Sequence, residues 1–188
     1  MSTDELGKTL LSLARGAIAA RFGGAATAAT AAAGDEPGTT ELSAPGATFV
    51  TLTQQGRLRG CIGSLEAWRP LAEDVRENAC AAAFRDPRFA PLSAAELPAT
   101  RVEVSLLSPP SPLPFSTEAE ALAKLRPGID GVILEYAGRR ATFLPQVWEQ
   151  LPEPHQFMAH LKQKAGLPAD FRDPEMKLSI YRVEKWKE

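Results

Sequence analysis

The chain has 188 residues, of which 44% are hydrophobic and 23% are charged, a composition that is typical of a globular protein. Its length indicates one domain, or one domain built from two similar halves, with enough apolar surface to fold without disulfides or metals. The formal net charge of -2 excludes a global positive field that would draw the protein to nucleic acid or to an anionic membrane.

The N-terminus and the cysteine usage predict a cytoplasmic protein. Residues 1–5 carry two acids where a secretory signal would need positive charge, and no apolar run approaches the ~20 residues of a membrane span. Because thiols stay reduced in the cytoplasm, Cys61 and Cys80 are expected to be free. Two Cys and two His without close ligand spacing predict no metal site, and no motif for a cofactor is present.

The first elements in chain order are a helix and a linker. Ser2 and Glu5 form a capping box, and apolar residues at helical spacing predict an amphipathic helix over 4–22, within an N-terminal helical segment 1–22. Residues 23–46 are rich in Ala, Thr, Gly and Pro and lack periodicity. We expect them to form a flexible surface connection.

Residues 47–110 and 111–188 read as two halves with the same order of elements. The Pro-rich run 108–114 is expected to leave the sheet. For the first half we predict a hairpin over 49–62, a helix from Pro70 that stops at Asp86-Pro87, a short helix after Ser93 and a strand over 101–107. For the second half we predict a helix over 117–125, a hairpin over 132–144, a helix from Phe157 to Gly166 and a final strand with Leu178, Ile180 and Tyr181.

One tetrapeptide occurs in both halves. Phe84-Arg85-Asp86-Pro87 recurs as Phe171-Arg172-Asp173-Pro174, each time between a helix and a strand. The shared order favours an ancient duplication of a hairpin-helix-strand unit, and coincidence between two turns is the equal alternative. Strands joined by hairpins and separated by helices predict an α+β fold with largely antiparallel sheets.

The segment from Leu58 to Gly63 (LRGCIG) carries the main candidate for chemistry. Alternate side chains of a strand share a face, and Leu58 and Ile62 are expected in the core. Arg57, Arg59 and Cys61 are then expected together on the other face. A neighbouring positive charge favours the nucleophilic thiolate, so we take Cys61 as the candidate nucleophile or redox thiol and the two arginines as ligand-binding residues.

Two glycines flank this thiol. Gly60 and Gly63 lack side chains, so a ligand could approach the backbone there, and both are candidate ligand-binding residues. The alternative is that Cys61 only packs, as a free cysteine on a strand often does, and that a bulge at Gly60 turns its side chain inward.

A second candidate is the turn after the predicted helix. Arg85 and Arg88 could bind an anionic ligand, with Asp86 orienting a guanidinium. The alternative is a helix stop in which Asp86 and Arg88 pair locally. His155 and His160 are the only imidazoles that could serve Cys61 as a base, and a structural role is the alternative for each.

The chain resembles the AMMECR domain family. The resemblance rests on the LRGCIG segment and on several later motifs, and it covers most of the chain. These later motifs are Asp86-Pro87-Arg88-Phe89, Val102 to Pro109, Gly128 to Val132, Thr142 to Trp148 and Lys164 to Leu167. The family, whose bacterial members include AmmeMemoRadiSam system protein A, implies a single AMMECR-like domain over 1–188 and a duplicated α+β arrangement.

The resemblance also implies where the site lies and which partners matter. It places the active or binding site in the LRGCIG-type segment, and it implies Memo-like and radical-SAM proteins as partners. Three functions stay open: a Cys-dependent enzyme acting on a small anionic ligand, a non-catalytic interaction or regulatory module, and a nucleic-acid regulator, which the composition disfavours. The sequence does not decide whether the protein is an enzyme, nor its oligomeric state.

Overall fold

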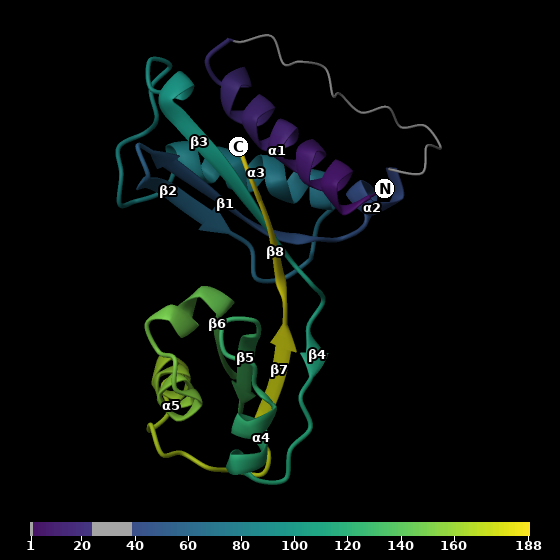
Figure 1. Ribbon diagram of the computed structural model, residues 1–188, viewed down its shortest axis with the longest axis vertical. Coiled ribbons are helices and arrows are strands. Elements are labelled where there is room, and N and C mark those ends of the chain that lie inside the picture. Colours follow the sequence, from purple (N-terminus) through teal and green to yellow (C-terminus); the bar gives the residue numbers. More distant parts are fainter. Residues whose placement is uncertain (1, 24–38) are drawn as a thin grey trace. The chain divides into compact units, whose positions relative to one another are not determined.

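The computed structural model describes residues 2–23 and 39–188, and these form two compact units (Figure 1). The first unit spans Met1–Leu107 and Glu184–Glu188, and the second spans Ser108–Val183. Helices and two four-stranded antiparallel sheets give an α+β fold, so the predicted fold class is confirmed. In the described part of the chain, none of the helices combines the length and apolar character that crossing a bilayer would require.

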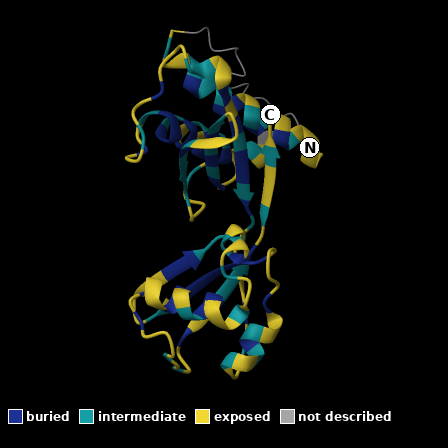
Figure 2. Ribbon diagram, turned by 60° about the vertical axis from the view of Figure 1, so that its left-hand side comes forward, coloured by how far each residue is buried: buried dark blue, intermediate teal, exposed yellow. Residues whose placement is uncertain are grey.

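The first unit packs helices on one face of a sheet with the strand order β2-β1-β3-β8. Buried valines and leucines of β1 and β3 form its core together with apolar residues of α1 and α3, and Figure 2 shows this buried interior. Its elements are α1 (Thr3–Ala20), α2 (Thr39–Ser43), β1 (Ala47–Gln54), β2 (Arg57–Gly63), α3 (Leu71–Phe84), a 3-10 helix (Leu97–Ala99), β3 (Thr100–Leu107) and β8 (Val183–Lys187).

The second unit has its own core beneath the sheet β4-β7-β5-β6. Trp148 and Phe157 stack at its centre, with ring centroids 3.7 Å apart, and both side chains are buried. Its elements are β4 (Ser111–Pro112), α4 (Glu118–Lys124), β5 (Gly131–Tyr136), β6 (Arg139–Phe143), a 3-10 helix (Pro145–Glu149), α5 (Pro154–Lys164) and β7 (Lys177–Tyr181).

Both hairpins turn in the same way. Gln55 and Gly56 have φ of 50° and 75°, and Ala137 and Gly138 have φ of 46° and 77°. Two successive residues with positive φ form the type I′ turn, whose twist matches that of antiparallel strands. The two predicted hairpins are therefore confirmed, and the turn residues set the register at the tip of each.

Several predicted elements need correction. The predicted connection 23–46 contains the helix α2, while its residues 24–38 lie outside the described part of the chain. Within the Pro-rich run, Ser111–Pro112 pairs with β7, so this run leaves the first sheet but joins the second. The short helix after Ser93 is only the 3-10 turn Leu97–Ala99, and the strand β8 was not predicted.

Candidate functional site

A β-bulge interrupts the strand that carries Cys61. The register of β1 against β2 shifts between Leu52 and Thr53: Leu52 pairs with Gly60, whereas Thr53 pairs with Leu58. Arg59 is therefore the extra residue on β2. An extra residue reverses the alternation of faces along a strand, so Leu58 and Cys61 fall on the same face.

The bulge contradicts the prediction that Arg57, Arg59 and Cys61 share a face. Leu58, expected in the core, is 44% exposed. Arg59 turns instead to Glu96, with Nε 2.9 Å from the carboxylate, and it lowers the pKa of Glu96 to about 2. Arg57 lies at the hairpin end of β2 opposite Gln54. Neither arginine is placed beside the thiol, because the strand does not keep the simple period of two.

Cys61 lies on the face of the first sheet that α1 and α3 leave uncovered. The other face carries Val50 and Leu52, which pack against both helices. Thr51 is the cross-strand partner of Cys61, and its hydroxyl donates to Sγ over 3.3 Å. Glu103 pairs with Thr51 from β3, so thiol, hydroxyl and carboxylate form one row across three strands.

The turn after α3 binds the backbone of Cys61. The Cys61 N–H donates to Asp86 Oδ2 at 2.9 Å, and its carbonyl accepts from Arg88 Nη2 at 3.3 Å. These backbone groups thus point away from β1. Side chains approach most closely in cross-strand pairs of this non-hydrogen-bonded type, which accounts for the contact between Thr51 and the thiol.

Asp86 and Arg88 form a bidentate ion pair. Nε and Nη2 of Arg88 lie 3.0 and 2.8 Å from the two carboxylate oxygens of Asp86. Asp86 is 4% exposed, and the hydrogen bonds from Arg88, supported by that from the Cys61 N–H, hold its pKa far below the usual range. The local pair weighed as the alternative for this turn is present, and it positions Arg88 next to Cys61.

Arg88 keeps the capacity to bind another group. Its side chain is 54% exposed, and within residues 2–23 and 39–188 its Nη1 has no hydrogen-bond partner. Hydrogen bonding to Asp86 raises the pKa of Arg88, and the charge of Cys61 adds to this effect. The site therefore presents a fixed guanidinium beside a half-buried thiol.

Gly60 and Gly63 have packing roles. A Cβ on Gly60 would lie 2.1 Å from the carbonyl oxygen of Ala82 in α3, and a Cβ on Gly63 would lie 2.2 Å from the ring of Phe49. Protein atoms thus fill the space that was expected to admit a ligand. Gly60 allows β2 to lie directly against α3, and this close approach sets the position of Cys61.

The other candidate residues have partners of their own or belong to the second unit. Arg85 bonds Glu77 on α3 at 3.1 Å. His155 and His160 belong to α5 of the second unit, where His160 Nδ1 lies 3.0 Å from the Gln156 carbonyl. Cys80 is free, with Sγ 3.6 Å from the Ala17 carbonyl, and burial raises its pKa. Among the described residues no cluster of His, Cys, Asp and Glu could hold a metal ion.

Sequence reasoning missed the network that supports the loop after β2. Asp74 is fully buried and accepts hydrogen bonds from the Thr48 N–H and hydroxyl at 2.8 and 2.7 Å, from Ser64 at 2.7 Å and from Arg69 at 2.8 Å. Asn78 adds a further bond to the same carboxylate at 2.9 Å. The signal that the sequence does contain is the spacing of Asp74 and Asn78, one helical turn apart in the helix predicted from Pro70.

These features define an α+β protein with a thiol and a guanidinium at the edge strand of a sheet. The chain belongs to the AMMECR1 family, which matches residues 11–186. A protein of Methanothermobacter thermautotrophicus is 43% identical over 72% of this chain and 71% of its own length. A Thermotoga maritima protein is 38% identical over 74% of this chain and 76% of its own length.

A solved structure agrees with the fold. The crystal structure of uncharacterized protein PH0010 from Pyrococcus horikoshii is 32% identical, with a TM-score of 0.77 over 98% of this chain and 92% of that one. The predicted family resemblance is thus confirmed. These relatives establish the family and the fold.

Proposed function

We propose that the protein acts on a small anionic substrate, with Cys61 as the reacting thiol and Arg88 as the group that holds the anion. The observation that carries the proposal is the ion pair of Asp86 and Arg88, which bonds both backbone polar groups of Cys61. It brings a half-exposed guanidinium to a thiol whose sulfur already accepts a hydrogen bond from Thr51. The proposed reaction uses the sulfur of Cys61 as the nucleophile.

The proposal changes the ligand-binding residues that the sequence indicated. Of the candidate arginines it keeps Arg88 alone as the anion-binding group, because its Nη1 is unused and its position is fixed by Asp86. A planar guanidinium with a free edge suits a carboxylate or a phosphate. The Thr51 hydroxyl donates a hydrogen bond to the sulfur, and Glu103 is the next residue in the same row across the strands.

Selective alkylation tests this site without knowledge of the natural substrate. In a Cys80→Ser background, rates of Cys61 modification are measured by mass spectrometry with iodoacetate, which is anionic, and iodoacetamide, which is neutral. We expect Arg88→Gln to lower the iodoacetate-to-iodoacetamide rate ratio by about threefold or more, since one positive charge is lost. Arg85→Gln, which removes an equally exposed arginine bound to Glu77, should leave the ratio unchanged.

Two further measurements separate folding from chemistry. Arg88→Lys keeps the charge and should keep most of the ratio, whereas a similar loss in this variant would point to a disturbed turn. A ratio that Arg88→Gln does not alter would refute the anion site. If Cys61 reacts no faster in the folded chain than in urea, the thiol has no special reactivity and the reacting role is wrong.

The second candidate function is a non-catalytic interaction module. Leu65 and Trp68 are 41% and 69% exposed on the loop between β2 and α3, and Arg69 stacks 4.6 Å from the Trp68 ring centroid. Exposed apolar side chains of this kind suit partner binding. Memo-like and radical-SAM proteins are the partner classes that the family resemblance implied. Partner capture that survives Cys61→Ser but is lost in Trp68→Ala would favour this function.

A further inference from the structure

The second unit carries two adjoining cavities that play no part in the Cys61 site. One has a volume of about 570 Å³ and the other of about 390 Å³. They share Glu135 and Lys177, which are cross-strand partners on β5 and β7. Together they form one groove, with these two residues between its ends.

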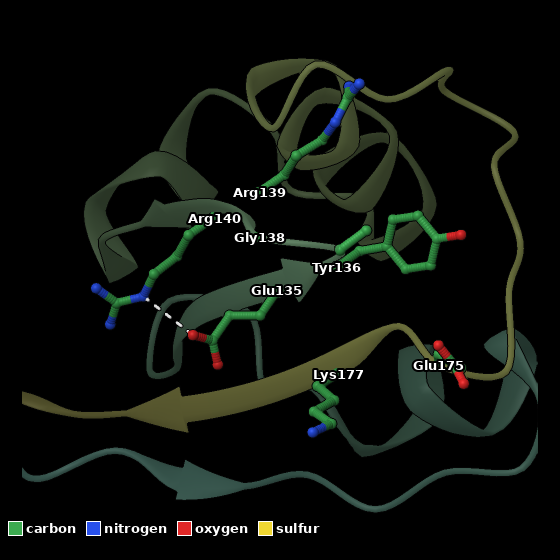
Figure 3. Close-up of a pocket in the computed structure, with 8 residues that line it drawn as sticks. Glu135, Tyr136, Gly138, Arg139, Arg140, Glu175 and Lys177 are labelled. Atoms are coloured by element: carbon green, nitrogen blue, oxygen red, sulfur yellow. Dashed lines mark ion pairs between the residues drawn. The ribbon is translucent and has the colours of Figure 1, made fainter.

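One end of the groove is charged. Arg140 pairs with Glu135 at 3.5 Å, and Figure 3 shows this pair on the side away from Tyr136. Arg139 points toward the end of α5, where it bonds the Gly166 carbonyl. The ammonium group of Lys177, by contrast, has neither a hydrogen bond nor an ion pair with any residue that the structure describes. The lining of this end carries three cations and two carboxylates, and this excess of positive charge favours an anionic ligand. The cations are Arg139, Arg140 and Lys177, and the carboxylates are Glu135 and Glu175.

The other end of the groove is apolar. Beyond Lys177 it is lined by Phe115, which is half-buried, and by Met176 and Leu178, whose side chains lie mostly in the core of the unit. Pro112 and Pro114 complete this wall. Both volumes lie in the range of small-molecule pockets, and a ligand there would meet one cation next to a ring-sized apolar surface.

We propose that this groove binds a small carboxylate with an aromatic or branched apolar body. The carboxylate pairs with Lys177, and the apolar body lies against Phe115 and Met176. The competing explanation is that Arg140, Glu135 and Lys177 are a solvated row of alternating charges on a sheet. That explanation accounts for the charges but not for the apolar wall beside the one cation that lacks a partner.

Benzoate is the probe, with benzamide as its neutral counterpart. The full chain has three methionines, Met1, Met158 and Met176, so labelling their methyl groups with carbon-13 gives three signals. We expect benzoate in the millimolar range to shift the Met176 signal saturably and to leave that of Met158, which lines neither cavity, in place. Benzamide should bind about fivefold more weakly, because it lacks the contact with the ammonium group.

Three variants decide the outcome. Lys177→Gln should weaken benzoate to the level of benzamide without altering benzamide binding, and Phe115→Ala should weaken both. Lys185→Gln, an exposed lysine on β8 that lines neither cavity, should change nothing. A Met176 signal that neither compound shifts would overturn the proposal, as would equal binding of the two compounds. The outcome does not depend on Cys61, so it leaves the proposed function untouched.

Discussion

The same tetrapeptide, Phe-Arg-Asp-Pro, forms the same turn in both units, but its aspartate binds different groups in each. Asp86 Oδ1 accepts the N–H two residues on, that of Arg88, at 3.1 Å, and Asp173 Oδ1 accepts that of Glu175 at 2.8 Å. The other oxygen differs. Asp86 Oδ2 binds the backbone of Cys61, whereas Asp173 Oδ2 binds the hydroxyl of Tyr136 at 3.1 Å.

The residue after the proline accounts for much of this difference. Arg88 can close a bidentate pair with its aspartate, while Glu175 in the same position repels Asp173 and turns into the groove beside Lys177. The two units also share the order of three strands in the sheet, β2-β1-β3 and β6-β5-β7. Along the chain, each hairpin is followed by a helix, α3 or α5, and then by the third strand. An internal duplication stays a hypothesis. The tetrapeptide itself determines the geometry of the turn, and the side chain after the proline, that of Arg88 or Glu175, determines which groups the turn binds.

The largest expected effect is on the packing that positions Cys61. Gly60→Ala places a methyl group 2.1 Å from a backbone oxygen of α3, and neither can move without shifting the strand. We expect a loss of about 3 kcal/mol in the free energy of unfolding, measured by urea denaturation. Gly16→Ala on α1, where a Cβ meets nothing within 4 Å, is the control and should stabilise by about 1 kcal/mol. A neutral Gly60→Ala would show that β2 is free to move away from α3.

Removing the two aspartates compares the turns directly. Asp86→Ala removes charged hydrogen bonds to Arg88 and to the Cys61 N–H and should cost about 2 kcal/mol in urea denaturation. Asp173→Ala removes bonds to a phenol and one N–H and should cost about 1 kcal/mol. Equal losses would mean that Arg88 adds nothing to the first turn.

Carboxyl groups of the first unit and tyrosines of the second should respond to opposite ends of the pH scale. Asp86 and Glu96 have lowered pKa values in the folded state, Glu96 to about 2, because each accepts hydrogen bonds from an arginine. The unfolded state takes up protons first, so stability is full above about pH 4.5 and falls as pH drops toward 2.

Tyrosines of the second unit behave in the reverse way. Burial raises the pKa of Tyr181, and the hydrogen bond to Asp173 raises that of Tyr136. The unfolded state then loses protons first, so stability falls as pH rises above about 10. Unfolding midpoints measured against pH should lose part of the acid slope in Asp86→Asn, because Glu96 keeps its own contribution, and part of the alkaline slope in Tyr181→Phe. Slopes that survive both substitutions would assign the pH dependence to other groups.

The smallest effect concerns the hydroxyl beside the thiol. Thr51→Val removes the hydrogen bond to Cys61 Sγ and should slow alkylation of Cys61 by iodoacetamide about twofold to threefold, since the thiolate loses one donor. Thr142→Val in the second unit removes a hydroxyl that contacts Tyr181 instead and should leave this rate unchanged. A faster reaction in Thr51→Val would mean that the threonine shields the thiol.

Local signals in the sequence were enough to predict most secondary-structure elements and to identify the family. Capping by Ser2 and Glu5, the turn glycines and the stop at Asp86-Pro87 all act within a few residues of chain, and the structure has them where the pattern placed them. The α+β class follows from their order. The motif from Leu58 to Gly63 and the later motifs were specific enough to identify the family correctly.

The geometry of the candidate site could not be predicted because it depends on contacts between distant residues. Gly60 had suggested a bulge that turns Cys61 inward, but the extra residue is Arg59, and its position depends on where β2 meets both β1 and α3. The same holds for Asp86, which reaches Cys61 across 25 positions in the chain. Glu96, the partner of Arg59, likewise lies 37 positions further along the chain.

The contact of Asp86 and Arg88 with Cys61 has a consequence for solubility. The strand β2 is an edge strand of its sheet, and the unpaired N–H and C=O groups of an edge strand can pair with a strand of another chain. The carboxylate and the guanidinium occupy these groups at Cys61, in the middle of the border. Removal of the Asp86 side chain therefore leaves this strand edge exposed. Variants of Asp86 should aggregate at protein concentrations at which the wild-type protein remains in solution.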